Sequence, residues 1–276
     1  MKYENLLLNH ISKRLLDSYI ANPRHALLLT GQEGVGLGTL AQALALELVE
    51  SPVDVLVVSP DDKGTLSIER VRNLYVETRD VRQARQVVII DNVDAMSLDA
   101  QNAFLKLLEE PNKQIHFILT THQLELLLTT IVSRSTTIDV KLIDKNSSER
   151  LLRQNSVKEP TKLSQILFIA EGRPAELVRL ANSTDYFEER SKYVKAARQL
   201  IEGSLYDRLV AVSNFTNRQD ALQLTRMLSL LLQFMYSRGH EPRLLKTAPI
   251  VEEVAAHLES NGHVKTQLMY LASAMP

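Results

Sequence analysis

A glycine-rich stretch near the N-terminus has most of the frame of a phosphate-binding loop but lacks its charged residue. It runs Gly31-Gln32-Glu33-Gly34-Val35-Gly36-Leu37-Gly38-Thr39. In the pattern G-x-x-x-x-G-K-[ST], the lysine reaches the β- and γ-phosphates of the nucleotide and the hydroxyl group binds Mg²⁺. Gly31 and Gly36 fit this pattern. Leu37 takes the place of the lysine, and Gly38 takes the place of the hydroxyl residue. Because phosphoryl transfer depends mainly on electrostatics, the stretch predicts the shape of an ATP site without its charge.

A second ATPase-like feature is an apolar strand that ends in acidic residues. It reads Val87-Val88-Ile89-Ile90-Asp91-Asn92-Val93-Asp94. In ATPases such a strand supplies a carboxylate that holds Mg²⁺ indirectly and a neighbouring glutamate that polarises the attacking water. Asp91 can perform the first task, but Asn92 cannot perform the second, because an amide is not a general base at neutral pH. Alone, the pattern equally fits any buried strand before a polar turn, and its position after the glycine-rich loop favours the ATPase-like interpretation.

Composition limits the other classes of function. The chain has 276 residues, with 32 Lys and Arg against 33 Asp and Glu, so no global basic field indicates nucleic acid and any DNA contact must be local. The absence of cysteine excludes disulfides, thiolate zinc sites and thiol catalysis. The seven histidines show no paired spacing, so we expect no metal site. Without a signal-peptide pattern or a run long enough to span a membrane, we expect a soluble cytoplasmic protein.

The elements that must position these residues alternate between strands and helices. Short apolar runs predict buried strands at 26–30, 53–58, 87–90 and 115–119. Periodic apolar positions and capping residues predict helices at 3–21, 40–49, from 67 onward, and 98–109. Such alternation predicts a parallel sheet covered by helices on both faces.

The strand signals stop at about residue 141. We expect a helix from 149, capped by Ser147 or Ser148, and further helices at 162–170, 174–181, 185–202, 204–213, 217–237, 247–260 and 263–274. The helix at 217–237 carries a wide apolar stripe, which fits either a bundle core or a contact with a sister subunit; the two interpretations are compatible. The residues of the stripe are Leu222, Leu224, Met227, Leu228, Leu231, Leu232 and Met235. We therefore predict an α/β domain with a degenerate P-loop at 1–140, a helical lid at 141–183 and an all-helical domain at 184–276.

Taken together, these residues resemble the delta-prime family of bacterial clamp-loader subunits, within the AAA+ superfamily. The resemblance covers about residues 4–183. It rests on 24–29, 67–72, 87–94 and above all Ala100-Gln101-Asn102-Ala103-Phe104-Leu105-Lys106-Leu107-Leu108-Glu109-Glu110-Pro111. From 184 on, the chain matches only as a helical domain of suitable size. The resemblance implies an AAA+ fold with a P-loop-like parallel sheet, a small helical lid and a C-terminal helical collar for oligomerisation.

The resemblance also implies a role in trans for one arginine. Ser133-Arg134-Ser135 is similar to the family's Ser-Arg-Cys element, with serine in place of the cysteine. In that family the arginine reaches the ATP site of the next subunit, so Arg134 would be an arginine finger supported by Ser133. From spacing alone, Arg134 would instead be an exposed arginine that closes a loop near Asp139, and the family context favours the finger.

Several positions depart from the family's ATPase pattern, and all of them weaken an ATP site. They are Leu37, Gly38, Asn92, His122 in place of a sensor asparagine, and Ala175 and Glu176 where a second sensor would carry arginine. Four further residues would form a vestigial nucleotide site that could still cradle phosphate with backbone amides: Gly31, Gly34, Gly36 and Asp91.

The implied function is that of a non-catalytic subunit for DNA replication. It would require no cofactor or metal, because ATP is bound by the neighbouring subunit. Its partners would be the ATPase subunits and delta in a hetero-pentamer, the sliding clamp and, through the complex, primer-template DNA, with no membrane. Ser67, Arg70 and Arg72 could contact DNA at a helix N-terminus, and a solvated, capped helix start fits them about equally well. The alternatives are an autonomous AAA+ ATPase with a non-standard loop and a pure scaffold whose Arg134 is incidental.

Overall fold

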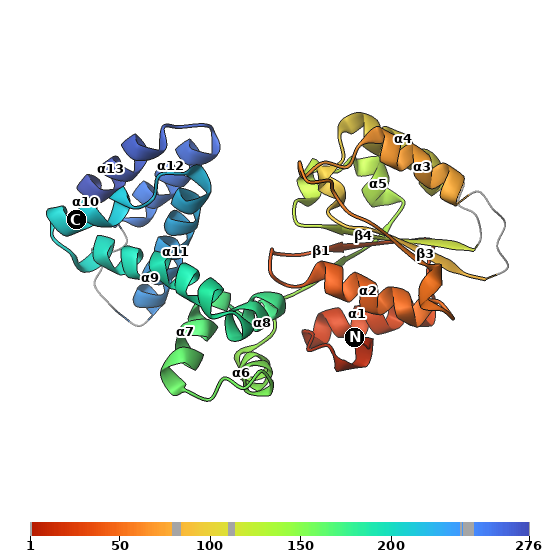
Figure 1. The fold of residues 1–276 in the computed structure, drawn as a ribbon, viewed down its shortest axis with the longest axis horizontal. Coiled ribbons are helices and arrows are strands. Elements are labelled where there is room, and N and C mark those ends of the chain that lie inside the picture. The colour runs from red at the N-terminus through yellow and green to blue at the C-terminus, as the bar shows by residue number, and fades with distance from the viewer. Residues whose placement is uncertain (1, 79–83, 110–113, 238, 240–245, 276) are drawn as a thin grey trace. The chain divides into compact units, whose positions relative to one another are not determined.

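In the described residues, five parallel strands form a sheet at the centre of the N-terminal part of the chain (Figure 1). The strands are β1 (Ala26–Thr30), β2 (Val55–Val58), β3 (Gln86–Ile90), β4 (Ile115–Thr121) and β5 (Thr136–Asp139), and their order is β2-β3-β4-β1-β5. Each neighbouring pair is parallel. Every residue of β3 and β4 is buried, as expected for strands covered on both faces. The predicted parallel sheet is therefore confirmed.

The structure is a computed structural model that describes residues 2–78, 84–109, 114–237, 239 and 246–275. It separates into two units, Met1–Asn182 and Ser183–Pro276. The division into domains at 1–140, 141–183 and 184–276 stays a prediction. Glu110 and Pro111, at the end of the run that carries the family resemblance, lie outside the described residues.

Helices cover both faces of the sheet. One face packs against α1 (His10–Ala21) and α2 (Leu37–Leu48), and the other against α3 (Ile68–Glu77), α4 (Leu98–Glu109) and α5 (Thr129–Ser133). Alternate residues of β1 serve the two cores, since Leu27 and Leu29 face the side of α2 whereas Leu28 faces the side of α4. Short 3₁₀ turns occur at η1 (Tyr3–Asn5), η2 (Pro52–Asp54), η3 (Val93–Ala95) and η4 (Leu124–Leu126).

Several predictions for this part were wrong. The strand predicted at 53–58 begins only at Val55, because Pro52–Asp54 forms η2 and Val53 is 83% exposed. The first helix begins at His10, not at residue 3, because Asn9 has a non-helical backbone and its side chain caps the helix by accepting a hydrogen bond from the Ile11 amide. The strand β5 was not expected. It is a short edge strand in which only Ile138 is buried, so it lacks the continuous apolar run that marks the other strands.

A helical segment completes the first unit with α6 (Lys145–Gln154), α7 (Pro160–Ala170) and α8 (Pro174–Asn182). The expected cap at Ser147 or Ser148 was wrong. Asp144 caps α6 by accepting a hydrogen bond from the Ser147 amide at 2.9 Å. This bond and a second one from the Ser147 hydroxyl lower the pKa of the Asp144 carboxyl. Pro174 begins α8, a position where its missing amide hydrogen costs nothing.

The second unit is helical throughout its described residues. Its helices are α9 (Thr184–Glu202), α10 (Leu205–Ser213), α11 (Arg218–Ser237), α12 (Ala248–Glu259) and α13 (Val264–Ala274), each within one residue of its predicted bounds. The apolar stripe of α11 is largely buried, and α11 packs on α9 and α12, so the bundle-core interpretation is confirmed. Nowhere in the described chain is a helix long and apolar enough to cross a membrane.

The buried His116 gives the sheet a pH-dependent contribution to stability. His116 is buried in β4, level with His25, whose carbonyl oxygen accepts from the Phe117 amide at 2.8 Å. Burial, and then the nearby charges of Arg85 and His25, lower the pKa of His116 below 6.5. The neutral imidazole therefore favours the fold fully above pH 6.5, and this contribution is lost as the pH falls through the lowered pKa.

We expect the free energy of unfolding, measured with urea, to decrease more between pH 7.5 and 5 for the natural chain than for His116→Gln. Glutamine removes the titrating ring and keeps a polar side chain of similar length. Equal pH dependence in the two proteins would contradict this prediction.

Candidate functional site

The glycine-rich loop connects β1 to α2 in a conformation that requires glycine. Gly34 and Gly36 have φ angles of +88° and +90°, in the left-handed region that only glycine enters readily. A Cβ atom at Gly31 would lie 2.9 Å from the carbonyl oxygen of Val140. The three glycines are therefore explained by the shape of the backbone, whether or not a nucleotide binds.

Leu37 and Gly38 are integrated into the fold at the start of α2. Leu37 is only 2% exposed and packs in the apolar core between α2 and the sheet. A Cβ atom at Gly38 would lie 3.4 Å from Oδ1 of Asp91, so the carboxylate lies directly beside the helix start. The lysine position of the nucleotide-binding pattern is thus occupied by a core residue.

The start of α8 lies directly on the loop. The amides of Ala175 and Glu176 donate to the carbonyl oxygen of Gly34 at 2.9 and 3.1 Å. A Cβ atom at Gly34 would lie 3.2 Å from the Cβ atom of Glu176, whose side chain is buried. Amides at a helix N-terminus are suited to phosphate. Here two of them bind the loop itself, and an acidic residue fills the adjoining space.

Arg173, which precedes α8, donates hydrogen bonds to the C-terminal end of α7. Its Nε donates to the carbonyl oxygen of Ala170 at 2.9 Å and its Nη2 donates to that of Ile169 at 2.7 Å. The side chain is buried, and a cation at this position stabilises the negative C-terminal end of α7. Its guanidinium is thereby bound to the C-terminal end of α7.

Asp91 and Asn92 follow β3 and are linked through Thr120 of β4. The Thr120 hydroxyl donates to Oδ1 of Asp91 at 2.6 Å and accepts from the Asn92 amide at 2.9 Å. Asn92 has φ of +51°, a left-handed conformation that asparagine tolerates better than most side chains. This backbone gives asparagine a structural reason to stand where ATPases carry glutamate.

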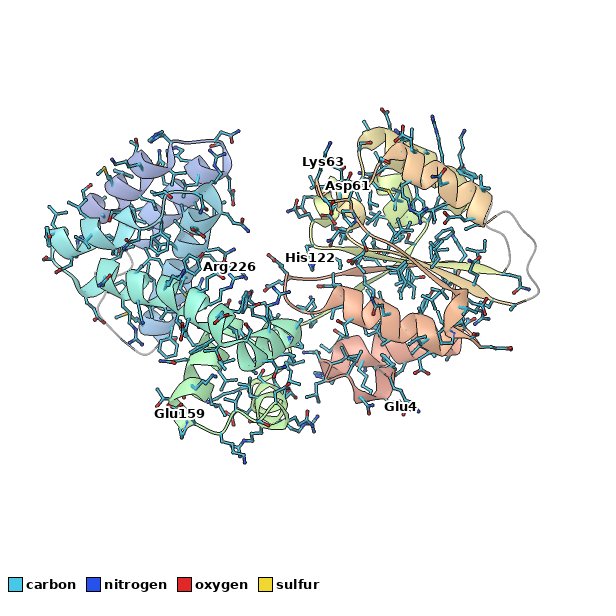
Figure 2. All side chains as sticks on the ribbon, viewed as in Figure 1. Glu4, Asp61, Lys63, His122, Glu159 and Arg226 are labelled. Carbon is cyan, nitrogen blue, oxygen red and sulfur yellow. The ribbon has the colours of Figure 1, made fainter. Side chains whose placement is uncertain are left out.

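His122 follows β4 and holds the beginning of the loop. Its Nδ1 atom lies 2.8 Å from the carbonyl oxygen of Gly31, and because a carbonyl only accepts, we assign the proton to Nδ1. Figure 2 shows His122 beside the loop at the edge of the sheet. The residue at the expected sensor position thus supports the loop backbone.

The structure therefore brings the loop, Asp91, His122 and the start of α8 to one edge of the sheet, at the carboxyl ends of β1, β3 and β4. Ligands of open α/β sheets bind at this edge. The vestigial nucleotide site predicted at Gly31, Gly34, Gly36 and Asp91 is consequently one place in the fold, and its use stays a prediction. Within the described ranges, no three His, Cys, Asp or Glu side chains are grouped to hold a metal ion.

Arg134 lies at the C-terminal end of α5 and is held by its own chain. Its Nη2 is 2.8 Å from Oε1 of Glu109, the last residue of α4, and its Nη1 donates to the carbonyl oxygen of Thr130 at 3.3 Å. The Arg134 side chain is 37% exposed. The alternative interpretation placed Arg134 near Asp139; in the structure Arg134 pairs with Glu109, and Asp139 pairs with Lys141.

Arg134 lies at the amino ends of the strands, whereas the loop lies at their carboxyl ends, on the opposite edge of the sheet. It precedes β5, whose first residue Thr136 is level with Leu27 at the start of β1, whereas the loop follows Thr30 at the end of β1. Three strand residues separate the two levels, which corresponds to about 10 Å before the turns at either end are added. Arg134 therefore lies remote from the loop of its own chain. Ser133 bonds to the carbonyl oxygen of Thr130, and its supporting role stays a prediction.

Sequence patterns identified Gln101 only as a member of the run 100–111 and did not predict that its side chain fixes α5 to α4. Its buried side-chain amide donates to the carbonyl oxygens of Met96 and Leu126 at 3.3 and 3.1 Å and accepts from the Leu128 amide at 2.8 Å. A glutamine on the buried face of an amphipathic helix was the available signal, since a buried amide needs partners. Through these bonds α4 positions the short helix that carries Arg134.

The residues proposed for DNA lie at the start of α3. The Ser67 hydroxyl caps the helix by accepting from the Arg70 amide at 3.3 Å, and Arg70 pairs with Glu77 at 2.8 Å. Arg72 is exposed. Asp61 and Lys63 occupy the preceding loop (Figure 2), where the Thr65 amide lowers the pKa of the Asp61 carboxyl and keeps it charged. A role in DNA binding stays a prediction for these residues.

Similar proteins are found among subunits of DNA polymerase III. Residues 49–144 match the family model described as DNA polymerase III, delta subunit. DNA polymerase III subunit delta' of Pseudomonas aeruginosa is 28% identical over 208 residues, which are 66% of this chain and 63% of that protein. Subunit delta' of Bacillus subtilis is 29% identical over 144 residues, 51% of this chain and 43% of that protein. The chain thus spans less than two thirds of the length of either relative.

A solved structure extends the likeness to nearly the whole chain. It is a DNA polymerase III gamma subunit-related protein from Thermotoga maritima, with a TM-score of 0.63, 18% identity, and coverage of 96% of this chain and 98% of that one. At this identity the likeness concerns the fold. The expected AAA+ fold, with a parallel sheet followed by helical parts, is confirmed.

Proposed function

Since the chain is a delta-prime-like protein of the DNA polymerase III clamp-loader group, we propose that it acts as a subunit that does not hydrolyse ATP itself. It braces the ring of AAA+ subunits and supplies Arg134 to the ATP bound by a neighbour. The neighbour's ATP then drives loading of the sliding clamp onto primed DNA. The single observation that carries this proposal is the contrast between the two edges of the sheet: a loop without its charge at one, and an accessible arginine at the other.

The loop supports a silent subunit through its missing charges and its occupied surroundings. A triphosphate needs cations and donors around its γ-phosphate, and this loop offers a buried Leu37, the Asp91 carboxylate and the acidic Glu176. The α8 amides that could bind an anion donate to Gly34 instead. The subunit accordingly requires no cofactor of its own.

Arg134 supports the action in trans through its location. It cannot serve its own loop from the opposite edge of the sheet, yet it is partly exposed and available to a second chain. A guanidinium presents five N–H donors in a planar fork that matches phosphate oxygens. The partners under this proposal are the ATPase subunits and delta, the clamp and, through the complex, primer-template DNA.

The test of the silent subunit uses the chain alone. We expect no ATP hydrolysis in the presence of Mg²⁺, and no difference between the natural chain and Asp91→Ala. The competing function, an autonomous ATPase, is favoured by the retained Asp91 and its hydrogen bond from Thr120. Turnover by the chain alone that Asp91→Ala abolishes would establish that function and contradict ours.

A further inference from the structure

Arg134 has an acidic partner on a different helix of its own chain. Glu109 ends α4, and its Oε1 lies 2.8 Å from Nη2 of Arg134. The two residues come from helices that pack against each other and that Gln101 ties together. Both side chains lie at the edge of the sheet opposite the loop, where α4 ends before β4 begins and α5 ends before β5 begins.

This pair contributes little to the stability of the fold. The side chain of Glu109 is 49% exposed and that of Arg134 is 37% exposed, and ion pairs between such exposed groups contribute little to folding. Glu109 therefore differs from Gln101, whose buried bonds fix the backbone of α5.

We propose that Glu109 is a positioning residue for Arg134 in the trans reaction; this inference rests on the proposed function. A free arginine side chain loses much rotamer freedom when it is fixed against a phosphate. The bonds to Glu109 and Thr130 engage one N–H group on each terminal nitrogen, and a guanidinium carries five N–H donors in all. One N–H group on each terminal nitrogen and the N–H group of Nε therefore remain for phosphate oxygens.

The test is single-turnover ATP hydrolysis in a clamp loader reconstituted with this subunit. The other ATP sites of the complex are inactivated by mutation of their P-loop lysines, so that only the site next to Arg134 hydrolyses ATP. We expect Glu109→Ala to lower the maximal rate about tenfold, comparable to the loss of an orienting partner at metal sites. The ATP concentration at half-maximal rate should not change, since the neighbour's own loop binds the nucleotide. Glu109→Gln, which keeps an acceptor oxygen, should recover part of the rate.

Three controls separate positioning from other roles. Glu125→Ala removes another exposed glutamate, on η4, and should leave the rate unchanged. The melting temperature of Glu109→Ala should equal that of the natural chain. Adding Glu109→Ala to Arg134→Ala should cause no further loss, because Glu109 acts only through that arginine.

The possible failures are distinguishable. If Arg134→Ala lowers the rate and Glu109→Ala does not, the positioning role is wrong and the proposed function stands. If Glu109→Ala raises the rate, the carboxylate competes with phosphate for Arg134, and the positioning role is also wrong. If Arg134→Ala itself has no effect, the proposed function fails.

Discussion

Replacement of Arg134 by alanine should nearly abolish ATP hydrolysis at the neighbouring site of the reconstituted clamp loader. Arginine fingers accelerate phosphoryl transfer by about 10³- to 10⁵-fold, or about 4 to 7 kcal/mol of barrier. Arg134 lies at the sheet edge remote from its own loop, and its guanidinium is partly exposed. The measurement is again single-turnover hydrolysis with the other sites inactivated. Arg134→Lys should recover little, because an ammonium cannot reproduce the planar fork.

The matched control for this prediction is Arg14→Ala. Arg14 is an exposed arginine on α1, a helix on the other face of the sheet, so its loss removes the same charge from a different surface. We expect an unchanged rate. Equal rates for the natural chain and Arg134→Ala would contradict the trans role and favour the pure scaffold.

Local patterns predicted most of the elements but not all of their ends. The helix α4 has the predicted bounds, because an apolar period with a clear start at Leu98 defines it. The start of α2 at Leu37, three residues before the expected start at Leu40, depends on the left-handed Gly36, and the start of α6 depends on the cap by Asp144. Caps depend on single side chains and backbone angles, so hydrophobic periodicity does not fix them.

The sequence also indicated which residues meet at the loop, but not how they meet. Sequence reasoning identified Gly31 and His122, which are 91 residues apart in the chain, and their bond is a product of the fold. The contact of α8 with Gly34 likewise joins distant segments through backbone atoms, which carry no sequence signal. The partnership of Glu109 with Arg134 escaped prediction for the same reason, because exposed charges are common and their partners depend on tertiary placement.

Restoring the lysine of the loop should destabilise the protein and should not create an ATPase. Leu37 is 2% exposed in the core between α2 and the sheet, so Leu37→Lys removes apolar contacts and requires the ammonium either to remain in an apolar site or to turn outward. We expect the free energy of unfolding to fall by about 2 to 5 kcal/mol, as for removal of a buried leucine side chain. The double variant Leu37→Lys, Gly38→Thr should also show no turnover, since Asn92, Glu176 and the α8 contact remain.

The matched control is Leu46→Lys, which places the same side chain on an exposed position of the same helix. It should change the free energy of unfolding by less than about 0.5 kcal/mol, as surface substitutions usually do. Urea unfolding and ATP turnover of the chain alone provide both measurements. If the double variant is as stable as the natural chain and hydrolyses ATP, then the loop lacked only its charges. The contact of α8 with Gly34 would then not prevent ATP hydrolysis. If it unfolds more readily and stays inactive, the leucine has become part of the core, and this subunit depends on a neighbour for its chemistry.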